Sequence, residues 1–135
     1  PDEQLLELAS AGTLSDRLDE QATRLIQDRR SWAFCREFTS QWLSLDKLDV
    51  LEVDRKRFGR LTRDTKVELR EEPARFLEHL LANDLSLRNL VASDFVVANE
   101  VVATYYGLGD RTDAGFRFEA IRHESDHLGG LLSQA

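Results

Sequence analysis

Residues 69–108 read LREEPARFLEHLLANDLSLRNLVASDFVVANEVVATYYGL, and they carry the most distinctive local pattern in the chain. Apolar side chains recur at helical spacing in both halves of it, and a short connection of polar and apolar residues separates the two patterns. Asn99 is a suitable N-cap for a helix over residues 100–106, and Gly107 is a suitable residue to end that helix. The stretch therefore predicts two packed helices around which the rest of the chain is organised.

The remaining sequence predicts further amphipathic helices. The expected helical ranges are residues 1–11, 15–29, 31–45 and 61–82, with a helical turn at 86–91. Pro73 lies inside the longest range and predicts a kink or a break near Glu71. Residues 116–118 alternate as a strand does, which predicts a short extended segment near residues 116–121. The expected fold class is therefore all-α, an irregular bundle of about five to six helices in one domain over residues 1–135.

The helix expected at residues 31–45 carries a wide aromatic face. The side chains that recur on it are Trp32, Cys35, Phe38 and Trp42, with Phe34 and Leu45 at its edges. Burying one large apolar side chain contributes roughly 1.5–3 kcal/mol, so we expect this face to lie deep in the core. An aromatic box for a cofactor is the alternative reading. Cys35 lies on the same face, which predicts an inert thiol rather than a nucleophile.

Composition narrows the classes of function. The chain has 25 acidic and 18 basic residues and a net charge of -7, which argues against broad nucleic-acid binding because that needs a cationic surface. No apolar run approaches the roughly 18 residues of a membrane span, so no membrane insertion is expected. The one cysteine excludes an internal disulfide and a CxxCH haem site, and no cofactor is expected in this domain. The chain begins at proline and contains no methionine, which suggests a module of a longer product and leaves its compartment unknown from the residues.

His123 and His127 form a candidate metal pair. They lie four residues apart with Asp126 beside them, so a helical turn would align both imidazoles for Zn²⁺. A tetrahedral site needs further ligands, such as His79 or a carboxylate from elsewhere in the chain. A metal-binding or metal-dependent hydrolase domain is therefore one alternative function.

Lys56, Arg60 and Arg63 form the second candidate site. In a helix they would share a face and could bind an anion, and together with Tyr105 and Tyr106 they suggest an anion- or glycan-binding module. A solvated helix face, neutralised by nearby acidic residues, is the plainer interpretation, and we favour it.

No catalytic residues are predicted. Glu71 and Glu72 are adjacent, and adjacent side chains on a helix point about 100 degrees apart, so the two carboxylates should not converge on a substrate. One of them is expected to charge the N-terminus of a helical segment after the break at Pro73. The chain has no Ser-His-Asp order, phosphate-binding glycine loop or HExxH motif. The residues therefore favour a domain without enzymatic activity of its own.

Four strings together resemble a known family. They are FTSQWLSLDKLD at residues 38–49, EEPARFLEHLL at 71–81, SDFVVANEVVATYYGL at 93–108, and the tail GGLLSQA at 129–135. Their order and spacing resemble a planctomycete-type domain of unknown function, found in large bacterial proteins that also carry cytochrome-c-like modules. The residues around His123 and His127 depart from the family pattern, which has an Arg-rich glycine signature after a variable turn at that place.

The resemblance implies an all-helical, extracytoplasmic module with no established activity. It implies that residues 123–135 lead into a neighbouring domain, and that the partners are neighbouring domains of the parent chain, with a haem-bearing module as a candidate. The positions that match the family are expected to be structural: Phe38, Gln41, Trp42, Leu43, Phe76, Asn99, Tyr106 and Gly107. The leading hypothesis is a non-catalytic module that docks or spaces other domains.

Overall fold

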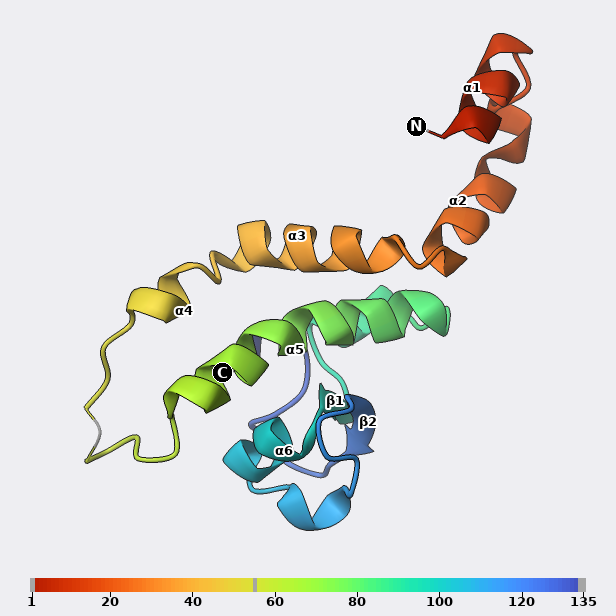
Figure 1. Cartoon of the computed structure of the whole chain (residues 1–135). Coiled ribbons are helices and arrows are strands. Elements are labelled where there is room, and N and C mark those ends of the chain that lie inside the picture. Colours follow the sequence, from red (N-terminus) through yellow and green to blue (C-terminus); the bar gives the residue numbers. More distant parts are fainter. Residues whose placement is uncertain (1, 55, 134–135) are drawn as a thin grey trace. The chain divides into compact units, whose positions relative to one another are not determined.

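The computed structural model describes residues 2–54 and 56–133, apart from the side chain of Asp49, and it is mostly helical (Figure 1). Pro1, suggested by the sequence as a helix start, and the last two residues of the tail lie outside the described residues. The chain divides into two compact units, residues 1–31 and 32–135. Across the described residues, none of the helices has both the length and the apolar character needed to cross a membrane.

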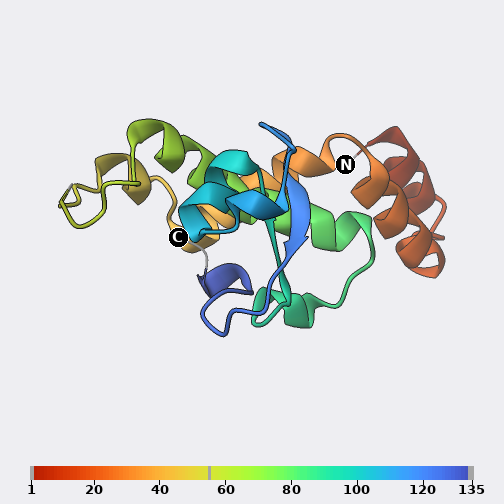
Figure 2. The same cartoon turned by 90° about the horizontal axis from the view of Figure 1, so that it is seen from below.

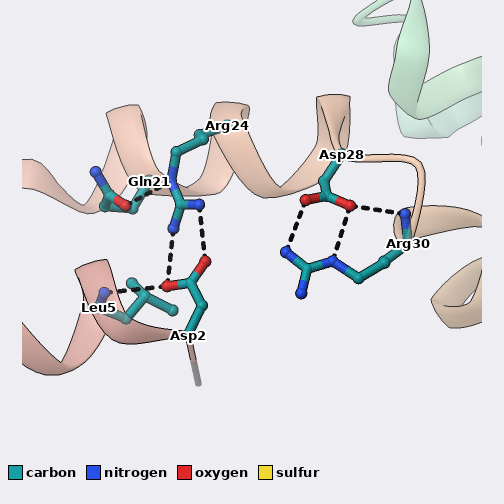
Figure 3. A network of polar contacts seen from close by, with 6 residues as sticks. All are labelled: Asp2, Leu5, Gln21, Arg24, Asp28 and Arg30. Atoms are coloured by element: carbon teal, nitrogen blue, oxygen red, sulfur yellow. Dashed lines mark hydrogen bonds and ion pairs between the residues drawn. The ribbon is translucent and has the colours of Figure 1, made fainter.

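The first unit contains two helices, and one carboxylate forms bonds to both of them. Helix α1 spans Glu3–Ser10, and a 3₁₀ turn at Ser15–Arg17 precedes α2 at Leu18–Gln27, which is shorter than the helix predicted at 15–29. Oδ1 of Asp2 accepts a hydrogen bond from the backbone N–H of Leu5 at 3.1 Å, and Oδ2 pairs with Arg24 Nη1 at 2.7 Å (Figure 3). The hydrogen bond from Arg24 lowers the pKa of Asp2. Asp2 thus caps α1 and ties it to α2.

The second unit is built on α5, which spans Arg63–Ala82 without interruption. Thr62 caps it by accepting a hydrogen bond from Thr65 N–H at 3.1 Å. Of the kink or break predicted near Glu71, the break is wrong: Pro73 is buried inside the continuous helix. A proline removes one backbone hydrogen bond, and the apolar stripe of Leu69, Phe76 and Leu80, buried on both sides of Pro73, offsets that loss.

Helix α6 spans Glu100–Tyr106 and confirms the prediction made for its ends. The side chain of Asn99 accepts a hydrogen bond from Val102 N–H at 3.0 Å, and Gly107 ends the helix in a left-handed conformation with φ 78. A left-handed residue is what the C′ position of a helix commonly needs, and glycine adopts it without steric cost. The short turn predicted at residues 86–91 is also present, as a 3₁₀ turn over Leu87–Leu90.

The fold is mostly helical, as expected, but a small two-stranded antiparallel sheet means that it is not strictly all-α. Strand β1, Phe95–Ala98, pairs with β2, Glu119–Arg122, and Val96 lies opposite Ile121 in the ladder. The extended segment predicted near residues 116–121 therefore lies slightly later in the chain. Its partner was missed because the sequence FVVA is apolar throughout and shows no alternation.

Strand β1 lies between two apolar clusters, and all four of its residues are buried. One face of it contributes to a cluster with α6 and β2, made of Leu69, Val96, Ala98, Val102, Ala103 and Ile121. The other face contributes to a cluster with α5, made of Phe76, Leu80, Phe95, Val97 and Leu131. The small sheet is therefore the centre of the core of the second unit.

Helix α3, Ser31–Leu43, lies along α5 on the side away from α6 and the sheet (Figures 1 and 2). The guanidinium of Arg75 on α5 lies 3.7 Å from the ring centroid of Trp32 on α3. A short helix, α4 at Lys47–Val50, follows, and two more 3₁₀ turns occur at Gly109–Arg111 and Leu131–Ser133. This arrangement leaves one face of α3 without a neighbour in the second unit.

Candidate functional site

The free face of α3 carries a row of three aromatic side chains. Phe34, Phe38 and Trp42 are 57%, 43% and 50% exposed, and we call them the aromatic row. The ring centroids of Phe34 and Phe38 are 5.7 Å apart, and those of Phe38 and Trp42 are 5.5 Å apart. The prediction that this whole face is buried in the core is therefore wrong for the aromatic row.

The core-facing side of α3 is formed by smaller residues instead. Cys35 and Thr39 are buried, and the Thr39 hydroxyl donates to the carbonyl of Cys35 at 2.8 Å. These two positions lie roughly a quarter-turn from the aromatic row around the helix. Helical periodicity predicts that α3 has an apolar surface. In the structure the small side chains of that surface pack on the side of α5, so the large rings point outward. The aromatic row is thus an exposed apolar patch rather than part of the core.

Cys35 is buried, as the sequence predicts. Burial and the negative charge of Glu78 raise the pKa of Cys35 to about 11. Because the thiolate is the reactive form, we expect Ellman's reagent to label the native domain far more slowly than the urea-unfolded domain. Equal labelling rates in the two states would contradict the buried position.

A polar network lies between α5 and α6. Asn99 is fully buried, and its Nδ2 donates to Oε2 of Glu68 at 2.7 Å. One helical turn further along α5, Oε2 of Glu72 accepts a hydrogen bond from the Tyr106 hydroxyl at 2.7 Å. Two residues expected to be structural, Asn99 and Tyr106, thus each contact a carboxyl group on the neighbouring helix.

Glu72 is the most perturbed acid in the described part of the chain. It is 0% exposed, and its second carboxyl oxygen has no hydrogen-bond partner among the described residues. Burial raises the pKa of Glu72 to about 8, and the hydrogen bond from Tyr106 acts in the opposite direction. The carboxyl is therefore mostly protonated at pH 7, and no solute reaches it in this conformation. The expectation that Glu71 or Glu72 charges a helix N-terminus is wrong, because α5 has no terminus there.

Replacement of Asn99 by alanine removes both the cap of α6 and the partner of Glu68. A lost N-cap costs about 0.5–2 kcal/mol, and the partly buried carboxylate of Glu68 loses a hydrogen bond, which adds to that cost. We expect Asn99→Ala to lower the free energy of unfolding by about 2 kcal/mol or more in urea titrations. Asn83→Ala, at an exposed amide, is the control and should change it by only a few tenths of a kcal/mol. Equal effects would argue against the buried network.

The structure does not place His123 and His127 on a helical turn. Their segment follows β2, and the backbone N–H of His123 donates to the carbonyl of Asp94, which extends the strand pairing by one residue. His123 is buried, with no hydrogen-bond partner for either ring nitrogen among the described residues, whereas His127 is exposed. Within residues 2–54 and 56–133, no group of three or more His, Cys, Asp or Glu side chains could hold a metal ion. The helical geometry on which the metal hypothesis rested is wrong.

The basic residues are not aligned on one helix face either. Helix α5 begins at Arg63, and Lys56 and Arg60 precede it in turns. Arg60 lines a groove beside α6, while Arg63 lines a different groove beside α4. The helical anion patch expected from Lys56, Arg60 and Arg63 is therefore not formed.

Comparison with known protein families identifies the family of this chain. The sequence model of the family PSD4, described as a protein of unknown function (DUF1592), matches residues 1–108. The chain belongs to this family. The part that matches the DUF1592 model runs from α1 to the end of α6 and includes β1, the aromatic row and the polar network. Strand β2, His123, His127 and the tail lie beyond it. No curated protein and no solved structure matches the chain.

The positions expected from the resemblance all lie within the part matched by the DUF1592 model. Phe76 belongs to the core, and Asn99, Tyr106 and Gly107 cap α6 or bond it to α5. Phe38, Gln41 and Trp42 instead lie on the exposed side of α3, where Gln41 Nε2 donates to Glu37 at 2.7 Å. Sequence reasoning missed Glu68 and Glu72. The signal was the spacing of Glu72, which falls in register with Leu69 and Phe76 on the buried stripe.

Proposed function

We propose that this domain is a non-catalytic docking module that holds a neighbouring domain of its parent protein through the aromatic row. The support is the exposure of Phe34, Phe38 and Trp42 side by side on one helix face. Apolar side chains gathered in one exposed patch are typical of interaction surfaces. Large aromatic residues are also enriched among the side chains that carry most of the energy of protein interfaces.

A folded protein surface is the partner that suits this row. The rings supply an apolar centre, and the hydrogen-bonded pair of Glu37 and Gln41 beside them supplies a polar edge. The sequence resemblance to planctomycete-type domains suggests a multidomain, extracytoplasmic parent protein with cytochrome-c-like modules. We therefore favour a haem-bearing module of the same polypeptide as the partner.

A non-catalytic role agrees with the state of the reactive groups. Glu72 is out of reach of any substrate, and the Cys35 thiol is buried with a raised pKa. The exposed face of the domain offers packing surface rather than an activated nucleophile or base.

Photo-cross-linking in the full-length parent protein tests this function. A benzoyl-phenylalanine at position 38 should cross-link to a peptide outside residues 1–135, and Trp42→Ser should reduce the yield of that product. Position 58 is the matched control, because Phe58 is an exposed phenylalanine of similar exposure, 51%, outside the row. Cross-links from position 38 that fall only within residues 1–135, or that do not exceed those from position 58, would contradict docking through the row.

A further inference from the structure

A second surface, distinct from the aromatic row, has the composition of a binding site. A groove of about 790 Å³ lies beside α6, and we call it the α6 groove. Its wall residues include Arg60, Thr65, Glu100, Tyr105, Asp110 and Phe116. The volume is within the range of small-molecule sites, roughly 300–1,000 Å³. The backbone N–H of Glu100 donates to the carbonyl of Gly115 at 2.9 Å, which fixes the loop that forms one side.

The charged side chains in the α6 groove have no partners within the described residues. Arg60, Glu100 and Asp110 line the same groove, yet their side chains form no hydrogen bond or ion pair there. Elsewhere in the domain charged groups do pair, as Arg75 does with Glu78 at 3.0 Å. The groove thus gathers two carboxylates, which only accept hydrogen bonds, and one guanidinium, which only donates them.

Two aromatic rings accompany these charges. Phe116 is 82% exposed, the largest exposure of any phenylalanine or tryptophan in the described residues. Tyr105 is half-buried, and its ring packs edge-on against Tyr106 with centroids 5.7 Å apart. Because the Tyr106 hydroxyl is bonded to the buried Glu72, Tyr105 rests on a fixed support. The rings give the groove apolar surfaces that flank its polar groups.

The charges and rings of the α6 groove together favour one class of ligand over others. A polyanion would face Glu100 and Asp110, and a polycation would face Arg60, so neither class matches both signs of charge. A sugar has hydroxyl groups that donate to carboxylates and accept from a guanidinium, and its C–H face packs on aromatic rings. We propose that the α6 groove binds a neutral saccharide, held between Tyr105 and Phe116 with its hydroxyls bonded to Glu100, Asp110 and Arg60.

Titration of the ¹⁵N-labelled domain with neutral oligosaccharides tests the proposal. The probes are cellotetraose, maltotetraose, xylotetraose and chitotetraose at millimolar concentration, with inorganic phosphate and spermine as charged comparisons. At least one oligosaccharide should shift the amide signals of residues 100–116. Phe116→Ala and Asp110→Asn should each weaken that binding by roughly tenfold.

Two matched variants separate the groove from the rest of the surface. Phe58→Ala removes an exposed ring elsewhere, and Asp113→Asn removes an exposed carboxylate that does not line the groove. Neither should change the affinity. The proposal is overturned if no neutral oligosaccharide shifts these signals, if only phosphate or spermine does so, or if the control variants weaken binding as much as the groove variants.

Discussion

Glu72→Gln is expected to remove a loss of stability that the wild-type domain undergoes between pH 5 and pH 8. The difference in the free energy of unfolding, variant minus wild type, should be a few kcal/mol larger at pH 8 than at pH 5. Burial raises the pKa of the Glu72 carboxyl from its ordinary value of 4.5 to about 8 in the folded domain. The folded state therefore holds a proton that the unfolded chain releases, so the wild type loses stability as the pH rises from about 4.5 to about 8. The slope is up to about 1.4 kcal/mol per pH unit. Glutamine does not titrate and still offers a carbonyl oxygen to the Tyr106 hydroxyl, so the variant should lose this slope.

Urea unfolding at pH 5, 6, 7 and 8 measures the effect. Glu71→Gln is the matched control, because Glu71 is the neighbouring residue on α5 and is only partly buried. The control should keep the pH dependence of the wild type. Parallel pH profiles for the wild type and Glu72→Gln would show that the buried carboxyl does not change its protonation on folding.

Phe76→Ala and Phe38→Ala should have very different effects on stability. Phe76 is 0% exposed and stacks on Phe95 with ring centroids 5.4 Å apart, so its removal leaves a cavity at the centre of the second unit. Truncation of a buried phenylalanine costs about 3–5 kcal/mol. Phe38 also stacks on a phenylalanine, Phe34, but it is 43% exposed, and its truncation should cost about 1 kcal/mol or less.

Chemical unfolding of the two variants under the same conditions gives this comparison directly. Both positions are phenylalanines inside helices, and each stacks on another phenylalanine ring, so helix propensity is matched. A cost for Phe38→Ala close to that for Phe76→Ala would mean that the aromatic row is part of the core. That result would remove the basis of the proposed docking surface.

The ends of the helices could be predicted from the sequence because local chemistry determines them. Asn99 and Gly107 bound α6 as expected, since an Asn side chain satisfies free N–H groups and glycine accepts the left-handed conformation. Pro73 shows where such local reasoning fails. Its effect depends on how much apolar surface the helix buries on both sides, which a local rule does not include.

The sheet and the orientation of α3 depend on packing between distant segments. Strand β1 is buried on both faces, so its sequence lacks the alternation that marks a strand with one exposed face. On α3, Trp32, Cys35, Phe38 and Trp42 together cover more than one face, and periodicity does not say which part meets α5. The part of the second unit that packs against α3 determines which side of the helix is buried, and that side is the one with Cys35.

The polar network between α5 and α6 could be predicted only in part. The sequence indicates that Asn99 is structural, but its partner Glu68 lies 31 residues away and the partner of Tyr106 lies 34 residues away. A glutamate on a buried stripe marks a polar contact that must form somewhere in the core. Which residue completes the contact follows from the tertiary arrangement of α5 and α6.

Solvent access to Trp42 determines whether α3 can carry a docking surface. In a Trp32→Phe variant, Trp42 is the one remaining tryptophan, and acrylamide quenching of its fluorescence reports whether solvent reaches the aromatic row. We predict strong quenching and red-shifted emission in the isolated domain, with both reduced when the domain is part of its full-length parent protein. Weak quenching and blue-shifted emission in the isolated domain, or identical quenching in both proteins, would contradict a docking surface on α3.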